Sequence, residues 1–186
     1  MILTKLTGLR LLAIGLLTLG VGTWAGSTAR AEAPTDGGTI VIGDSNGAPV
    51  EVPVALFGDI AVTGPWARAT NAGSRVGGVY FGIENRSASE IRLLSVATPV
   101  AQATALNDMP LIDKVARIVP VEGGIAIPPG GKVELRPGGL HVMLKGLTSP
   151  LRPGARFPMT LEFSNGTSAD VEVQIWDVGA MRIISQ

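Results

Sequence analysis

The sequence predicts an all-β protein built as an antiparallel β-sandwich, and three observations carry this prediction. Beyond residue 58 the chain contains many short apolar runs of the length that strands have. Sequences rich in Gly and Pro separate these runs, namely IPPGGK, RPGGL, RPGAR and SNGTS. The same region shows neither long helical periodicity nor an internal repeat. Short strands separated by regular turn signals are typical of two packed sheets.

The first segment of the chain has the pattern of an export signal. Lys5 and Arg10 give it a positive start, and the apolar core that follows over residues 11–25 is short for a membrane span. An Ala-Arg-Ala sequence then ends at Ala31, where we expect cleavage. A retained N-terminal anchor is the alternative. We therefore expect residues 1–31 to be a signal peptide and the mature protein to be periplasmic, with no membrane insertion after cleavage.

The remaining chain divides into three parts. Residues 32–58 begin with a polar stretch and continue with two β-branched runs around DSNG, so they form either a linker or an added β-hairpin. Strand-like runs fill residues 59–178, which we expect to be the sandwich domain. Residues 179–186 are a short C-terminal tail. Within the domain, residues 104–119 are ambiguous and could form a strand, a loop and a strand, or contain one helical turn.

Composition excludes several classes of function. Removal of Lys5, Arg10 and Arg30 with the signal leaves 12 basic residues against 15 acidic ones, and no basic patch stands out. Nucleic acid is therefore not an expected partner. The sequence has no cysteine, which excludes disulfides, thiolate chemistry and a lipid anchor on cysteine. The single histidine, His141, has no nucleophile elbow around it, and zinc hydrolysis needs several clustered ligands. We therefore do not expect an enzyme.

That histidine lies in GGLHVMLKGL, with Met143 two residues further on. In a strand, His141 and Met143 point from one face, and the aliphatic Val142 and Leu144 point from the other. Imidazole and thioether are soft, neutral ligands, which suit Cu(I) better than Mg²⁺, Ca²⁺ or a structural zinc. The alternative is that the two side chains share a face of a packed strand by chance.

Two ligands rarely suffice for a metal, so a further ligand must come from another segment. The other methionines of the mature chain are Met109, Met159 and Met181. Met159 lies in the apolar FPMTLEF and is expected in the core. Met109 lies in the polar, Pro-bounded ALNDMPL and is the better candidate. The predicted metal ligands are therefore His141, Met143 and Met109.

Three stretches give the sequence a resemblance to a known family. They are VTGPWARAT, RVGGVYFGIENRS and the long block from ARIVPVEGG through GGLHVMLKGL to MTLEF. Together they resemble the PCu(A)C periplasmic copper chaperones over about Ile60 to Ile175. This resemblance implies a Greek-key, cupredoxin-like β-sandwich.

The resemblance also implies a Cu(I) site. The family holds Cu(I) with an early His, a later Met and a final His-x-Met, and the final pair matches His141 and Met143. Asn107 stands where the early His is expected, and Ile118 stands where the Met is expected. An amide is a poor ligand for Cu(I) and an isoleucine is none, so the implied site is weakened. Met109, two residues beyond Asn107, is our hypothesis for a third soft ligand.

Two functions follow from these observations. The first is a periplasmic Cu(I)-binding, chaperone-like protein that delivers copper towards cytochrome oxidase assembly. Its partner would be a copper-accepting periplasmic or membrane-bound oxidase subunit. The second is a metal-free binding or scaffold module of the same fold that has lost the copper site. The retained His141 and Met143 favour the first function, whereas Asn107 and Ile118 favour the second.

Overall fold

The computed structural model describes residues 35–43 and 49–177, with side chains described from Pro53 to Asp177. The predicted signal peptide and the predicted C-terminal tail beyond residue 178 lie outside the described residues. Within the described residues the backbone forms strands, turns and bends, which confirms the all-β class. This part of the chain contains no helix long and apolar enough to cross a membrane.

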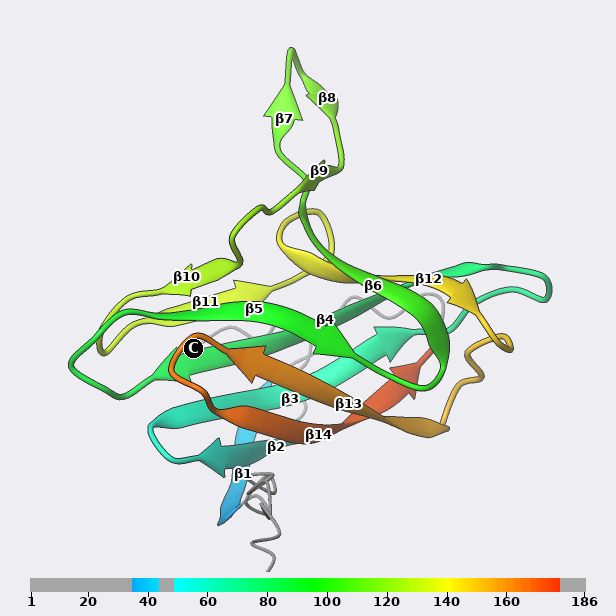
Figure 1. Cartoon of the computed structure of the whole chain (residues 1–186). Coiled ribbons are helices and arrows are strands. Elements are labelled where there is room, and N and C mark those ends of the chain that lie inside the picture. Colours follow the sequence, from blue (N-terminus) through cyan, green and yellow to red (C-terminus); the bar gives the residue numbers. More distant parts are fainter. Residues whose placement is uncertain (1–34, 44–48, 178–186) are drawn as a thin grey trace, which may run out of the picture.

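The described residues contain fourteen strands, which Figure 1 labels. Their bounds are β1 Thr35–Gly43, β2 Pro49–Phe57, β3 Ile60–Arg68, β4 Val76–Asn85, β5 Ile91–Ala97, β6 Ala101–Asp108, β7 Leu111–Ile112, β8 Val115–Ala116, β9 Val119–Pro120, β10 Ile125–Ile127, β11 Lys132–Leu135, β12 His141–Leu147, β13 Arg156–Phe163 and β14 Ser168–Trp176.

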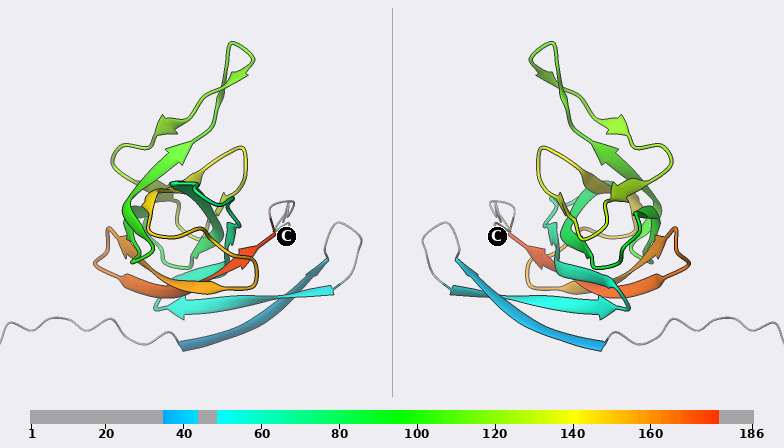
Figure 2. Two further views of the ribbon diagram at one scale, coloured as in Figure 1. Left: turned by 90° about the vertical axis from the view of Figure 1, so that its right-hand side faces the viewer. Right: turned by 90° about the vertical axis from the view of Figure 1, so that its left-hand side faces the viewer.

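All strands but β7 and β8 join one hydrogen-bonded sheet that curls on itself. Its main path runs β10-β5-β13-β14-β3-β4-β12-β6-β9, with β2 added to β3 and β11 added to β4. The ladders are antiparallel except for β14 and β3, which run parallel. Two views at right angles to Figure 1 show the strands wrapped around a common interior (Figure 2). The predicted β-sandwich is confirmed, with one parallel pair that the sequence did not predict.

The sheet can curl because its central strands change partners along their length. The first half of β3, Ile60–Thr63, pairs with β2, and the second half, Trp66–Arg68, pairs with β14. The register against β4 shifts between these halves, at Gly64 and Pro65. Gly64 has a φ of 53°, and proline has no N–H for the ladder. Such a bulge bends a strand and lets it pass from one layer to the other.

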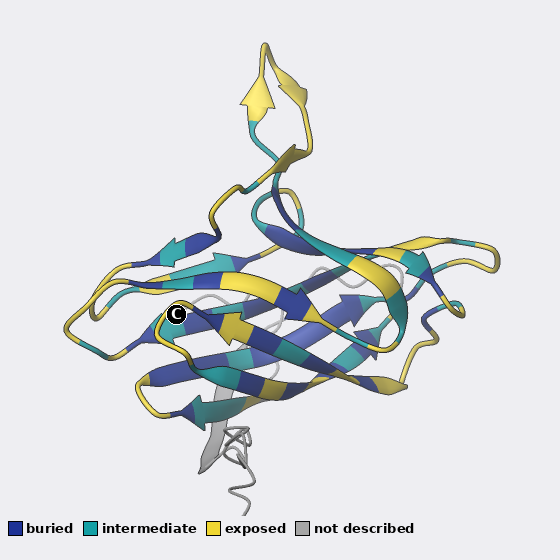
Figure 3. Ribbon diagram, in the orientation of Figure 1, coloured by how far each residue is buried: buried dark blue, intermediate teal, exposed yellow. Residues whose placement is uncertain are grey.

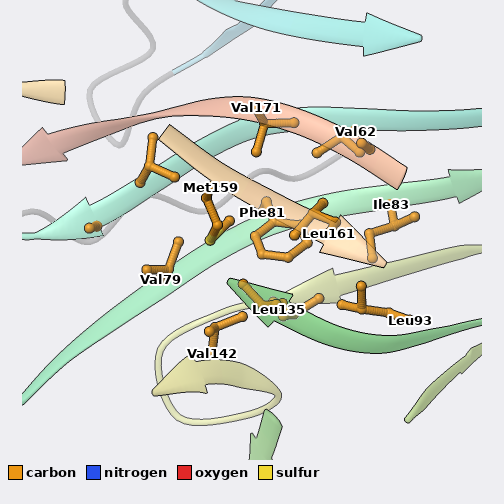
Figure 4. Packing of buried hydrophobic residues seen from close by; sticks show 14 of the residues in the cluster. Val62, Val79, Phe81, Ile83, Leu93, Leu135, Val142, Met159, Leu161 and Val171 are labelled. Carbon is orange, nitrogen blue, oxygen red and sulfur yellow. The ribbon is translucent and has the colours of Figure 1, made fainter. Parts of the chain in front are cut away.

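The core consists of buried aliphatic and aromatic residues, and Figure 3 shows buried residues alternating with less buried ones along several strands. Figure 4 shows Met159 packed among these side chains, and it is only 1% exposed. This confirms the expectation that Met159 belongs to the core. Within residues 32–58, for which the sequence left two alternatives, the described strands β1 and β2 pair antiparallel, and β2 also pairs with β3.

The ambiguous stretch at residues 104–119 begins within β6, which is part of the sandwich, and its later part projects from the sandwich. After β6, the short strands β7 and β8 form a hairpin that stands clear of the body (Figures 1 and 2). Asp113 and Lys114 join these strands with φ values of 53° and 64°. Two positive φ values in a two-residue loop define a type I′ turn, which usually contains Asn or Gly. Because Asp-Lys lacks that signal, the sequence did not predict this hairpin.

Candidate metal centre

Strand β12 places the predicted pair as its alternation requires. Val142 and Leu144 are fully buried in the core, while Met143 is half-buried on the opposite face and Lys145 is exposed. His141 shares the face of Met143 but is itself buried, with 6% of its surface exposed. The imidazole is therefore shielded from solvent, whereas the thioether is partly accessible.

The turn before β12 fixes the His141 ring. Its Nδ1 lies 2.8 Å from the carbonyl oxygen of Gly139. A carbonyl can only accept, so Nδ1 carries the proton and the neutral ring keeps its lone pair on Nε2. Nδ1 makes this hydrogen bond, so Nε2 is the ring nitrogen left to bind a metal. Metal-binding histidines are commonly oriented in this way, by a hydrogen bond from the nitrogen that does not bind the metal.

Asn107 lies directly opposite His141 in the ladder between β6 and β12. Directly opposed residues point from the same face, with Cβ atoms about 5 Å apart. Asn107 is 3% exposed, and its Nδ2 has no hydrogen-bond partner among the described residues. The position that the resemblance assigns to the early His thus lies next to the ring of His141. In this chain it contributes an amide group, which is a poor ligand for Cu(I).

Met109 and Ile118 lie in the segment that connects β6 to β9. Met109 follows β6, is half-buried, and its backbone N–H donates to Asp108 Oδ1 at 2.8 Å. Ile118 precedes β9 and is 50% exposed. Because Asn107 pairs with Pro120 and Asp108 with Val119, the same register sets Met109 opposite Ile118. Both residues therefore lie close along the chain or the ladder to Asn107 and Pro120. The role of Met109 as a third ligand stays a prediction.

The two predicted ligands on β12 offer one nitrogen and one sulfur donor. Among the residues whose side chains are described, no three His, Cys, Asp or Glu residues gather as a set of metal ligands. Opposite Met143 in the ladder is Ala105, which adds no donor. The imidazole of His141 and the thioether of Met143 are soft donors on one face of β12, and this chemistry fits Cu(I).

The fold is a β-sandwich that carries a His-x-Met pair on one face of β12. The chain belongs to the family described as "Putative lipoprotein LpqE-like", whose sequence profile matches residues 60–175. This range coincides with the extent of the predicted resemblance. A curated relative, "Putative lipoprotein Lxx21020" of Leifsonia xyli subsp. xyli (strain CTCB07), is 27% identical over 130 residues, which cover 70% of this chain and 77% of the relative.

Solved structures share the fold. The apo PCuAC domain of PmoF2 superimposes with a TM-score of 0.58 at 24% identity, covering 69% of this chain and 98% of that one. The copper-bound PCuAC domain of PmoF2 gives 0.56 at 23% identity, covering 67% and 97%. Apo-DR1885 from Deinococcus radiodurans gives 0.50 at 24% identity, covering 89% and 98%. These likenesses confirm the predicted cupredoxin-like fold.

Proposed function

We propose that this protein is a copper-chaperone-like protein of the cell envelope that binds Cu(I) through His141 and Met143, with Met109 as a third ligand. The observation that carries the proposal is the hydrogen bond between His141 Nδ1 and the Gly139 carbonyl. It leaves the Nε2 lone pair free on the face where Met143 lies. A soft nitrogen and a soft sulfur two residues apart on one strand suit Cu(I).

The incomplete ligand set supports a carrier more than a storage site. With Asn107 and Ile118 at two positions, a bound Cu(I) has at most three ligands from this chain. An open coordination position lets a ligand of an acceptor protein attach before the donor ligands leave. In this proposal the acceptor is a copper-accepting periplasmic or membrane-bound oxidase subunit. The periplasmic location rests on the signal-like N-terminus and on relatives described as putative lipoproteins.

A Cu(I) titration of the mature protein against a competing chelator tests the proposal. We expect His141→Ala to weaken binding at least tenfold, which corresponds to about 1.4 kcal/mol. Met143→Leu should weaken it as well, since leucine keeps the volume and removes the sulfur. Met159→Leu is the matched control, because this methionine is buried in the core and should leave affinity unchanged. A wild type that binds Cu(I) no more tightly than His141→Ala would refute copper binding at this site.

A metal-free binding module is the second candidate, and one observation favours it. The buried side chain of Asn107 occupies the position beside His141 where the resemblance expects a second histidine ligand. A chain without that ligand is what a metal-free module would have. If the titration shows no copper binding at His141, this reading becomes the better one.

A further inference from the structure

One polar side chain of the candidate metal centre is left without a partner. Asn107 is 3% exposed, and its Nδ2 has no hydrogen-bond partner among the described residues. An amide N–H₂ group offers two donors, and native structures nearly always pair a buried donor, because leaving it unpaired is unfavourable. The amide therefore lacks an acceptor on the face of the sheet that carries His141.

The neighbours of Asn107 explain why this donor is unpaired. Across the two ladders of β6 it faces His141 on one side and Pro120 on the other. Along the chain, Ala105 and Met109 are its neighbours on the same face, because residues two apart in an extended chain share a face. None of these four side chains carries an oxygen that could accept the hydrogen bond. The missing acceptor must therefore be a bound molecule or ion.

The proposed metal ligands leave a charge unbalanced at the same place. His141 is neutral, because its Nδ1 donates to the Gly139 carbonyl, and the thioether of Met143 is neutral as well. Cu(I) held by this pair keeps its positive charge beside the buried ring of His141. A charge in such a position is unfavourable unless it is paired. An anion would satisfy both the metal and the amide of Asn107.

The charged side chains nearby are compatible with an anion and do not replace it. Lys145 follows Met143 on the same face of β12 and is exposed. The carboxylate of Asp108 belongs to the opposite face of β6, because consecutive residues of a strand alternate. Its Oδ1 accepts a hydrogen bond from the backbone N–H of Met109 at 2.8 Å. This carboxylate is therefore already engaged and does not neutralise a metal beside His141.

We propose that the centre binds a halide ion together with Cu(I), with the halide attached to the metal and hydrogen-bonded by Asn107 Nδ2. This inference rests on the proposed function, because it concerns a ligand of the bound metal. A halide is a soft monoanion, so it suits Cu(I) better than a carboxylate does and cancels the charge of the metal. It fills the open coordination position until a ligand of the acceptor displaces it. A bound water would pair with the amide but leave the charge unbalanced.

X-ray absorption at the copper edge, on the mature wild-type protein loaded with Cu(I) in bromide buffer, provides the first test. Bromide is the probe, because a heavy neighbour of copper is distinguished from nitrogen and sulfur. We expect a bromine neighbour in addition to nitrogen and sulfur. Copper bound by nitrogen and sulfur alone would overturn the halide and leave the proposed function standing. A protein that binds no copper would refute both.

Variants of Asn107 provide the second test, which assigns the halide to the amide. Asn107→Leu keeps the volume and removes the donor, whereas Asn107→Asp keeps the shape and places a carboxylate where the halide would lie. We expect both variants to lose the bromine neighbour while copper stays bound by nitrogen and sulfur. Using two variants keeps the test decisive if one of them folds poorly. A bromine neighbour that persists in a folded variant would overturn the role of Asn107.

Tyr80→Phe is the matched control for these variants. The Tyr80 hydroxyl oxygen lies 2.6 Å from where a Cβ of Gly78 would stand, and Gly78 is opposite Met143. The control therefore removes a polar atom on the β4 side of β12, whereas Asn107 lies on the β6 side. Tyr80→Phe also keeps the ring that packs against Trp66. We expect this variant to retain the bromine neighbour.

Chelator competition titrations in nitrate and in bromide buffers of equal ionic strength measure the same effect as an affinity. Bromide also binds free Cu(I), but this competition is identical for every variant and cancels in a ratio of affinities. From nitrate to bromide, the affinity of wild type relative to Asn107→Leu should rise about fivefold. The affinity of wild type relative to Tyr80→Phe should stay unchanged. A constant ratio for Asn107→Leu would overturn the proposal, as would an equal rise for Tyr80→Phe.

Discussion

Asn107 and His141 face each other as a buried ladder pair, and the amide nitrogen of Asn107 has no hydrogen-bond partner among the described residues. Two buried polar side chains thus lie side by side at one end of the sheet, one with a free ring nitrogen and the other with an unused donor. This pair connects the fold to the proposed function, because a single substitution would turn the amide into a second imidazole.

We predict that Asn107→His increases Cu(I) affinity at least tenfold, or about 1.4 kcal/mol. The new ring would point from the same face as His141 and add a soft nitrogen ligand. A chelator competition titration measures the change, with Asn165→His in the exposed turn after β13 as the control. Unchanged affinity would show that the ladder partner of His141 lies outside the metal's reach.

Ile118→Met, introduced together with Asn107→His, should increase Cu(I) affinity further. Ile118 is half-exposed just before β9, so a longer unbranched side chain can be accommodated there. The same titration measures the gain over Asn107→His alone. An affinity equal to that of the single variant would place residue 118 outside the site.

Met109→Leu should weaken Cu(I) binding several-fold if Met109 is the third ligand. Leucine keeps the apolar volume but has no sulfur, so any loss reports on ligation and not on packing. The effect is read from a Cu(I) titration of this variant beside wild type. Identical affinities would remove Met109 from the site and leave His141 and Met143 as the ligands.

Asn85→Ala should lower the free energy of unfolding by about 3 kcal/mol. Asn85 is fully buried, and its Nδ2 donates to the carbonyls of Ser89, Ile127 and Pro128 at 2.7, 3.1 and 3.2 Å. Its Oδ1 accepts hydrogen bonds from Ser87. Alanine would leave the buried carbonyl of Ile127 and several partly buried groups without this partner. Denaturant titration measures the loss, and the exposed Asn165→Ala should cost far less; equal losses would contradict the prediction.

Gly124→Ala should destabilise the protein more than Gly138→Ala. Both glycines have positive φ values, 82° and 81°, so an alanine carries the same backbone cost of about 1 kcal/mol at each. Only at Gly124 would the new Cβ also collide with the backbone carbonyl of Leu93, whereas nothing lies near Gly138. Thermal unfolding of the two variants compares them directly. A larger loss at Gly138 would disprove the close approach.

Burial raises the pKa of the Tyr80 phenol above its ordinary value of 10.0, and the nearby Arg68 partly opposes this shift. The folded state therefore holds the phenolic proton more tightly than the unfolded state. Stability from this group is complete below about pH 10 and falls as pH rises through the folded pKa. Tyr80 is the only tyrosine, so phenolate absorbance reports on it alone. A folded midpoint at or below that of the denatured chain would contradict the shift.

The period of two along β12 was enough to predict that Val142 and Leu144 enter the core while Met143 does not. The buried position of Met159 followed from its apolar neighbours in the same way. The burial of His141 could not be predicted, because alternation assigns a face but does not say whether that face is covered. Nor could its pairing with Asn107, since a register between strands more than thirty residues apart has no local signal.

The sequence predicted neither the projecting hairpin nor the parallel strand pair. The hairpin lacks its usual turn sequence, and the parallel pair joins strands that are distant in the chain. The type I′ turn at Asp113 and Lys114 lacks the glycine that normally marks it. The parallel pairing of β14 with β3 joins strands from the two ends of the domain, and turn signals identify only neighbouring strands.

That parallel pair has a consequence for how the chain acquires its structure. The last strand of the domain lies between β13 and β3, in the interior of the sheet and not at its rim. A chain that emerges N-terminus first therefore keeps two unpaired edges until residues 168–176 arrive. Closing the sandwich must await contacts across most of the domain, which slows folding and prolongs exposure of these edges. We therefore expect the sandwich to close only after the whole domain has been released.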